Sequence, residues 1–119
     1  MDEKEELMKL NEEIRKKEEE IWKAEKKVLE KEEELDLEFA KMEMKIAEEK
    51  DPVTHKPIYS NEQARKNAFK LELRDRKDLQ EKINFIKTEK NAIKLDEIEL
   101  KYLLRKFSVL KRLVERREE

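Results

Sequence analysis

The chain has 119 residues, and 52% of them are charged, against a usual share of about 25%. It contains no glycine, no cysteine and only two prolines. A chain without glycine is poorly suited to hairpin-rich β-structure, glycine-rich phosphate loops and dinucleotide-binding fingerprints. A chain without cysteine has no disulfides and no cysteine-ligated metal. The enriched residues, Glu, Lys, Leu, Ile and Arg, are typical of long helices and coiled coils.

Charge is distributed unevenly between the two halves of the chain. Residues 1–50 carry 19 acidic and 12 basic residues, a net charge of −7, whereas residues 51–119 carry 13 acidic and 18 basic residues, a net charge of +5. Opposite charges on the two halves favour a chain that folds back on itself, and a near-neutral total favours order over disorder. No apolar window approaches the ~18 residues of a membrane span, and the acidic start does not resemble a signal peptide. We therefore expect a cytoplasmic protein without membrane contacts.

Apolar residues recur every seven positions in residues 3–50, which predicts one long helix with a coiled-coil seam. The seam consists of Leu7, Ile14, Ile21, Val28, Leu35 and Met42. From Leu35 it continues through Phe39, Met42 and Ile46 at spacings of 4, 3 and 4. Such a shift is expected because seven residues are slightly less than two full turns of 3.6 residues, so a heptad stripe drifts slowly around the helix.

Residues 51–60 contain both prolines, Pro52 and Pro57, which predicts a turn that reverses the chain. After it, Ser60 and Gln63 match a capping box, with Ser60 as the N-cap and Gln63 reaching back to it. The only histidine, His55, lies in this turn without a second histidine or a cysteine as partner. We therefore expect an exposed turn residue rather than a metal ligand.

A second helical region is predicted over residues 61–117, with its own heptad seam. The seam consists of Leu79, Ile86, Ile93, Leu100, Phe107 and Val114. The charged stretch 74–78 interrupts the apolar pattern, so we expect a kink there, with Asp75 as the N-cap of a new helix. The predicted fold is a single all-α domain, a long antiparallel helical hairpin that associates as a dimer or higher oligomer.

The sequence gives no indication of an enzyme, a cofactor or a metal site. Carboxylates are numerous, but general acid–base catalysis needs a carboxylate that is desolvated in a pocket. A two-helix hairpin offers no such pocket, and we interpret the carboxylates as solvated helix faces.

Residues 98–114 are rich in apolar side chains, ten of 17, and one partner helix cannot cover them all. A second copy of the chain is the simplest partner. A groove in another protein, a membrane surface or nucleic acid are the alternatives. The predicted interface residues are Leu100, Leu103, Leu104, Phe107, Leu110 and Val114, together with Trp22 on the first helix.

A basic cluster follows the turn and consists of Arg65, Lys66, Lys70, Arg74, Arg76 and Lys77. Four of these residues, Lys66, Lys70, Arg74 and Lys77, are spaced by 4, 4 and 3 and share one helix face. The candidate nucleic-acid contacts are Arg65, Lys66, Lys70, Arg74 and Lys77, with Tyr59 as a stacking residue. The alternative is a charged helix face that pairs with acidic residues 30–49.

The segment Lys56-Pro57-Ile58-Tyr59-Ser60-Asn61-Glu62-Gln63-Ala64-Arg65 is similar to a Lys-x-x-Tyr-Ser-Asn-Glu-x-x-Arg turn between two helices in small phage and prophage coiled-coil proteins of unknown function. The resemblance covers about ten residues by motif and most of the chain by layout. It implies a phage-type accessory protein, which would lie in the host cytoplasm. It supplies no catalytic residues and directs attention to Tyr59, Asn61, Glu62 and Arg65.

Three functions are compatible with these patterns. The first is a non-enzymatic adaptor or scaffold that self-associates and binds an unidentified protein partner. The second is a nucleic-acid-binding accessory factor in phage replication or recombination. The third is an inhibitor of a host defence enzyme, in which the acidic first helix mimics nucleic acid.

Overall fold

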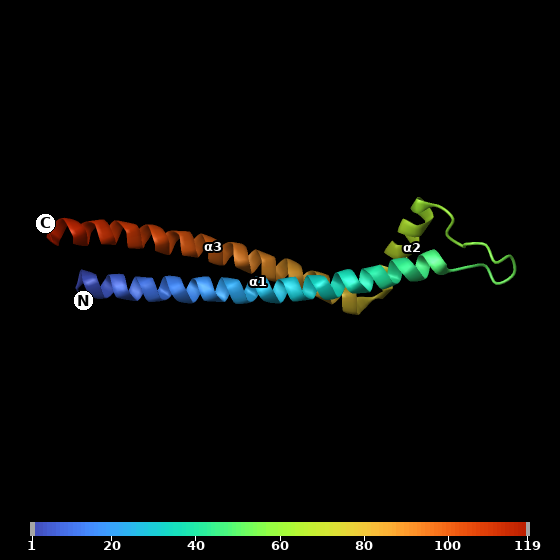
Figure 1. The fold of residues 1–119 in the computed structure, drawn as a ribbon, viewed down its shortest axis with the longest axis horizontal. Coiled ribbons are helices and arrows are strands. Elements are labelled where there is room, and N and C mark those ends of the chain that lie inside the picture. The colour runs from blue at the N-terminus through green and yellow to red at the C-terminus, as the bar shows by residue number, and fades with distance from the viewer. Residues whose placement is uncertain (1, 119) are drawn as a thin grey trace. The chain divides into compact units, whose positions relative to one another are not determined.

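The computed structural model describes residues 2–118, which form three α-helices (Figure 1): α1 (Glu3–Glu48), α2 (Glu62–Asp75) and α3 (Lys77–Glu118). The chain divides into two compact units. The terminal unit contains residues 2–28 and 88–118, and the turn unit contains residues 29–87. Within each unit, ion pairs join α1 to the returning chain in antiparallel order, Lys4 to Glu118 in the first and Lys45 to Glu72 in the second. The prediction of an all-α helical hairpin is therefore confirmed.

The two heptad seams predicted from the sequence form the interior of both units. Buried seam residues in the terminal unit are Ile14, Ile21, Val28 and Ile93, joined by Leu10 and Leu103. Those in the turn unit are Leu35, Met42, Ile46, Leu79 and Ile86. The seam residues Leu7, Phe39, Leu100, Phe107 and Val114 are half-buried. Because burying a Leu or Ile side chain contributes about 1.5–3 kcal/mol, this narrow seam is the main source of stability.

Local interactions explain where α1 begins and where it ends. At the start, the Asp2 side chain accepts a hydrogen bond from the Glu5 backbone N–H at 2.8 Å, which is N-cap geometry. Glu3, Glu5 and Glu6 in the first turn interact favourably with the positive end of the helix dipole. At the other end, α1 stops at Glu48, shortly before Pro52, as the two-proline pattern predicts.

The turn is organised by Asp51. Its Oδ1 accepts hydrogen bonds from the backbone N–H groups of Val53, at 2.8 Å, and Thr54, at 3.0 Å. The Thr54 and Val53 N–H groups lower the pKa of the Asp51 carboxyl, so this stabilisation is present at neutral pH and lost as pH falls through the lowered pKa. His55 is exposed, as expected, and has a left-handed φ of 59°.

The N-cap of α2 lies one residue later than predicted. Asn61, rather than Ser60, occupies the N-cap, and its side-chain oxygen accepts a hydrogen bond from the Ala64 N–H at 2.7 Å. Asn caps a helix as well as Ser does, and this start places Glu62 in the first turn, where a negative charge is favourable. Gln63 bonds to Asn67 instead of reaching back, so the capping-box prediction was wrong.

The expected kink is a complete break at Arg76, between α2 and α3. The Arg76 guanidinium donates two hydrogen bonds to the carboxylate of Asp78, at 3.0 and 2.9 Å, and one to Glu38 on α1 at 3.4 Å. Gln80 Nε2 donates to the carbonyls of Leu73 and Arg74, which satisfies the end of α2. Asp75 is the last residue of α2, so its predicted role as the N-cap of the next helix was wrong.

Candidate interaction surfaces

One lysine of α1 joins the two arms of the terminal unit. Lys17 Nζ lies 3.1 Å from a carboxylate oxygen of Glu99, 3.5 Å from Asp96 and 3.4 Å from Glu20. Its side chain is only 17% exposed. The hydrogen bond to Glu99 is the main cause of a raised pKa for this lysine, so it stays charged at neutral pH.

The ion pairs between α1 and the returning chain do not follow the simple pattern of an acidic arm against a basic arm. In the terminal unit, α1 supplies the cation in Lys4 and Lys17 and the carboxylate in Glu3, which pairs with Arg117. In the turn unit, Glu34 pairs with Lys82 at 3.5 Å, in addition to the Lys45 and Arg76 pairs. The excess of acid on α1 and of base on α3 is therefore not used up within the hairpin.

The apolar segment 98–114 divides between an inner and an outer side. Leu103 is buried with Leu10 and Ile14 of α1. Leu100, Phe107 and Leu110 pack against the same cluster. Of the predicted interface residues, Val114 is half-buried, while Leu104 and Trp22 are exposed. The inner residues thus have a partner within their own chain, and the apolar excess lies elsewhere on α3.

That excess forms a second stripe, which we call the outer stripe. It consists of Leu95, Ile98, Tyr102, Val109 and Leu113, which are between 43% and 68% exposed. Their spacings are 3, 4, 7 and 4, so at 100° per residue all five lie within a sector of about 60°. The sector lies about 120° around α3 from the residues that pack against α1. A partner helix that packs on the outer stripe would bury side chains that α1 of the same chain does not contact.

Basic side chains border the outer stripe. They are Lys94, Lys101, Arg105, Lys106 and Arg112. Within residues 2–118, none of these five side chains forms an ion pair. The one acidic residue at this border, Glu99, is already engaged by Lys17. The outer stripe is therefore an apolar surface with positively charged edges.

The exposed side of α1 carries three apolar side chains among charges of both signs. Met8, Trp22 and Leu29 are exposed and lie 14 and 7 residues apart, on one face of the helix. Lys26 Nζ lies 5.4 Å from the centre of the Trp22 ring, a cation–π distance. Four glutamates border this face, Glu12, Glu18, Glu19 and Glu25, while Arg15 lies on the face itself, midway between Met8 and Trp22.

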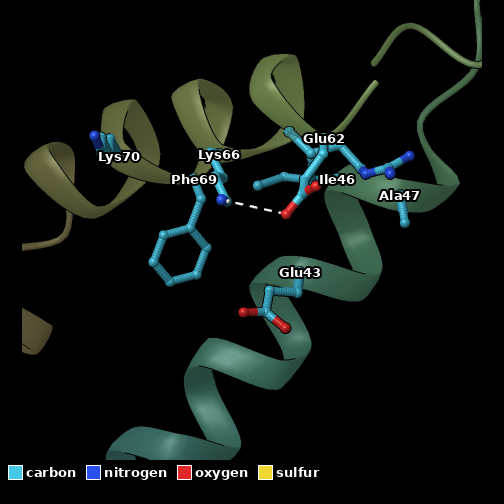
Figure 2. A pocket seen from close by; sticks show the side chains of 8 residues that line it. Glu43, Ile46, Ala47, Glu62, Lys66, Phe69 and Lys70 are labelled. Carbon is cyan, nitrogen blue, oxygen red and sulfur yellow. Dashed lines mark ion pairs between the residues drawn. The ribbon is translucent and has the colours of Figure 1, made fainter. Parts of the chain in front are cut away.

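A groove of about 480 Å³ lies in the turn unit between α1 and α2 (Figure 2). Ile46, Ala47 and Phe69 supply its apolar lining, and the ring of Phe69 makes an edge-to-face contact with Phe39 at 5.3 Å between ring centres. Its polar rim consists of Glu43, Glu62, Arg65, Lys66 and Lys70. Lys66 is paired with Glu62 at 3.2 Å, as the dashed line in Figure 2 shows.

Three of the predicted nucleic-acid contacts, Arg65, Lys66 and Lys70, line this groove, whereas Arg74, Lys77 and Tyr59 do not. The predicted continuous basic face was wrong at Lys77, because the helix breaks at Arg76 and Lys77 begins α3. The alternative, pairing with acidic residues 30–49 of α1, is found at Arg76, which contacts Glu38 at 3.4 Å. In the described chain, Arg65 and Lys70 form no ion pair, and Arg74 lies 4.0 Å from its neighbour Asp75. Of the three cations at the rim, Arg65 and Lys70 are therefore available to an external ligand, whereas Lys66 is paired with Glu62.

The outer stripe and the role of Lys17 were not recognised from the sequence. The spacing of 3, 4, 7 and 4 was a usable signal for the stripe. A lysine three positions after a seam residue was a signal for a charged contact between the arms.

Residues 2–118 contain no group of three or more His, Asp or Glu side chains arranged to hold a metal ion. None of the described helices is both long and apolar enough to cross a membrane. Comparisons of the chain with protein-family models, curated proteins and solved structures give no match.

Proposed function

We propose that this protein is a non-enzymatic coiled-coil adaptor that self-associates and acts through protein–protein contacts. The observation that supports the proposal is the outer stripe, five exposed apolar side chains in register on one side of α3. Exposed apolar side chains gathered on one side of a helix are typical of a place where another protein binds. The similarity of residues 56–65 to phage and prophage proteins supports a phage-type accessory role, and the 52% charged composition suits an aqueous compartment such as the cytoplasm.

Light scattering of purified variants tests this proposal. We expect the double variant Ile98→Glu/Val109→Glu to weaken self-association at least tenfold, because two charged side chains replace apolar groups at the centre of the contact. Leu104→Glu is the matched control, since Leu104 is an exposed apolar residue of α3 that lies off the outer stripe. Equal masses for the double variant and the wild type would contradict the proposal.

A second function, nucleic-acid binding, is favoured by the unpaired Arg65 and Lys70 at the rim of the groove. If it is correct, fluorescence anisotropy with labelled single- and double-stranded oligonucleotides at low salt should detect binding. Arg65→Glu/Lys70→Glu should weaken it and reduce the slope of log affinity against log salt by about 2. The control Lys101→Glu/Lys111→Glu makes the same charge change on α3. No binding of either oligonucleotide at low salt would exclude this function.

A further inference from the structure

We infer that the groove between α1 and α2 binds a small organic monoanion with an apolar body, such as a fatty acid or an aryl carboxylate. This site goes beyond the proposed function, which depends on the outer stripe of α3. Every residue that lines the groove belongs to the turn unit, so the site is complete within one compact part of the chain. Its volume of about 480 Å³ lies in the range of ~300–1,000 Å³ that is typical of small-molecule sites.

An aromatic contact closes one end of the groove. The rings of Phe39 and Phe69 meet at 5.3 Å between their centres and join α1 to α2 at this point. On α1, the lining residues lie within 43–47, beyond Phe39 toward the turn. On α2, three of the five lining residues lie within 62–66, which is also the turn side of Phe69. A long partner helix that runs along the groove would meet the aromatic contact, whereas a compact ligand ends before it.

The floor of the groove is apolar and includes an aromatic ring. Ile46, Ala47 and Phe69 supply this floor, and Figure 2 shows the Phe69 ring directed from α2 into the space beside α1. Phe69 is half-buried although its ring contacts Phe39, so part of its surface remains accessible to a ligand. Removal of this surface from water favours the binding of an apolar ligand body.

The charges on the rim match a single negative charge on the ligand. Lys66 is paired with Glu62 at 3.2 Å, so these two charges neutralise each other. Among the described residues, Arg65, Lys70 and Glu43 form no ion pair, which leaves two positive charges and one negative charge on the rim. A monoanion neutralises the remaining positive charge. A polyanion would instead bring further negative charges against Glu43.

Arg65 lies where it can hold an anionic group beside the apolar floor. Arg65 and Phe69 are four residues apart on α2, so their side chains are neighbours on one side of the helix. A guanidinium is always charged and binds a carboxylate through two parallel hydrogen bonds. A carboxylate bound by Arg65 therefore leaves the apolar body of the ligand next to the Phe69 ring.

Fluorescence titration with anilinonaphthalene sulfonate, an aromatic monoanion, tests the inference. We expect the fluorescence of this dye to rise on binding and to fall again when decanoate displaces it. Arg65→Gln/Phe69→Ala should weaken dye binding at least about tenfold, because it removes a charge-assisted hydrogen bond and part of the floor. Ala47→Phe should have a similar effect by filling the groove, and it keeps the contact between Phe39 and Phe69. Circular dichroism checks that helix content is unchanged.

The outer stripe supplies the matched control, because it also combines apolar and positively charged side chains. Tyr102→Ala/Arg105→Gln removes one aromatic ring and one cation from that surface. Tyr102 is 63% exposed, so this variant should fold like the wild type. We expect it to retain the dye binding that decanoate displaces.

Four outcomes would overturn the inference. The first is no change in dye fluorescence with the wild type. The second is equal dye binding by the wild type and Ala47→Phe, which would place the dye outside the groove. The third is loss of binding only in Tyr102→Ala/Arg105→Gln, which would place it on the outer stripe. The fourth is displacement by a single-stranded oligonucleotide and not by decanoate, which would make the occupant a polyanion. None of these results depends on the mass of the protein, so self-association is tested separately.

Discussion

Replacing Leu79 by alanine is expected to lower the free energy of unfolding by about 2–5 kcal/mol, the range for a large buried aliphatic side chain cut back to alanine. Leu79 has an exposed fraction of 0% and is the one large side chain in the described core that is fully enclosed. It follows the break at Arg76 by three residues, where the backbone is already held by hydrogen bonds of Leu79 and Gln80 N–H to the Arg76 carbonyl. The surrounding structure therefore has little freedom to collapse into the cavity.

Urea unfolding followed by circular dichroism measures this effect. Leu71→Ala is the matched control, because Leu71 is 54% exposed on α2 and should change the free energy of unfolding by no more than about 0.5 kcal/mol. Similar losses for the two variants would mean that the chain after the break does not pack as described. A loss of several kcal/mol is a large share of the ~5–15 kcal/mol that stabilises a typical domain.

Reversing the charge of Lys17 is the second large effect that we expect. In Lys17→Glu, the ion pairs to Asp96, Glu99 and Glu20 become contacts between like charges at a site that is only 17% exposed. We expect the fall in Tm to be several times that of Lys23→Glu, whose lysine is 67% exposed and pairs only with Glu19. Thermal unfolding by circular dichroism makes the comparison.

The dependence of stability on salt and pH provides two further tests of the Lys17 ion pairs. The difference between the two variants should shrink at high salt, because screening reduces repulsion between the carboxylates. In the wild type, the raised pKa means that the contribution of Lys17 is fully present at neutral pH and is lost only as strongly alkaline pH rises through that pKa. An equal effect of Lys17→Glu and Lys23→Glu would show that Lys17 does not join the arms.

The sequence predicted the buried seams well because a heptad repeat specifies which side of a helix is apolar, whatever the partner. Ile14, Ile21 and Val28 are buried as the repeat required, and so are Leu79 and Ile86. The cap of α2 was missed by one residue because Ser60 and Asn61 are both good N-caps, and the choice between them depends on the path of the chain leaving the turn.

The interaction surfaces were harder to predict because α3 carries two apolar stripes. Both stripes have a helical period, and the packing of Leu103 against Leu10 and Ile14 shows which one faces α1. The ion pairs between the arms were hard to predict for a similar reason. The net charges of the halves predict attraction, whereas the individual pairs depend on register, so that Lys17 of the acidic arm meets Asp96 and Glu99 of the basic arm.

The central claim is that exposed apolar surface on this hairpin serves self-association. Its most direct test is sedimentation of the unmodified chain over a wide range of micromolar concentrations. We predict an average mass that rises with concentration to at least twice the 14.6 kDa of one chain. A mass that stays at 14.6 kDa throughout would contradict the claim.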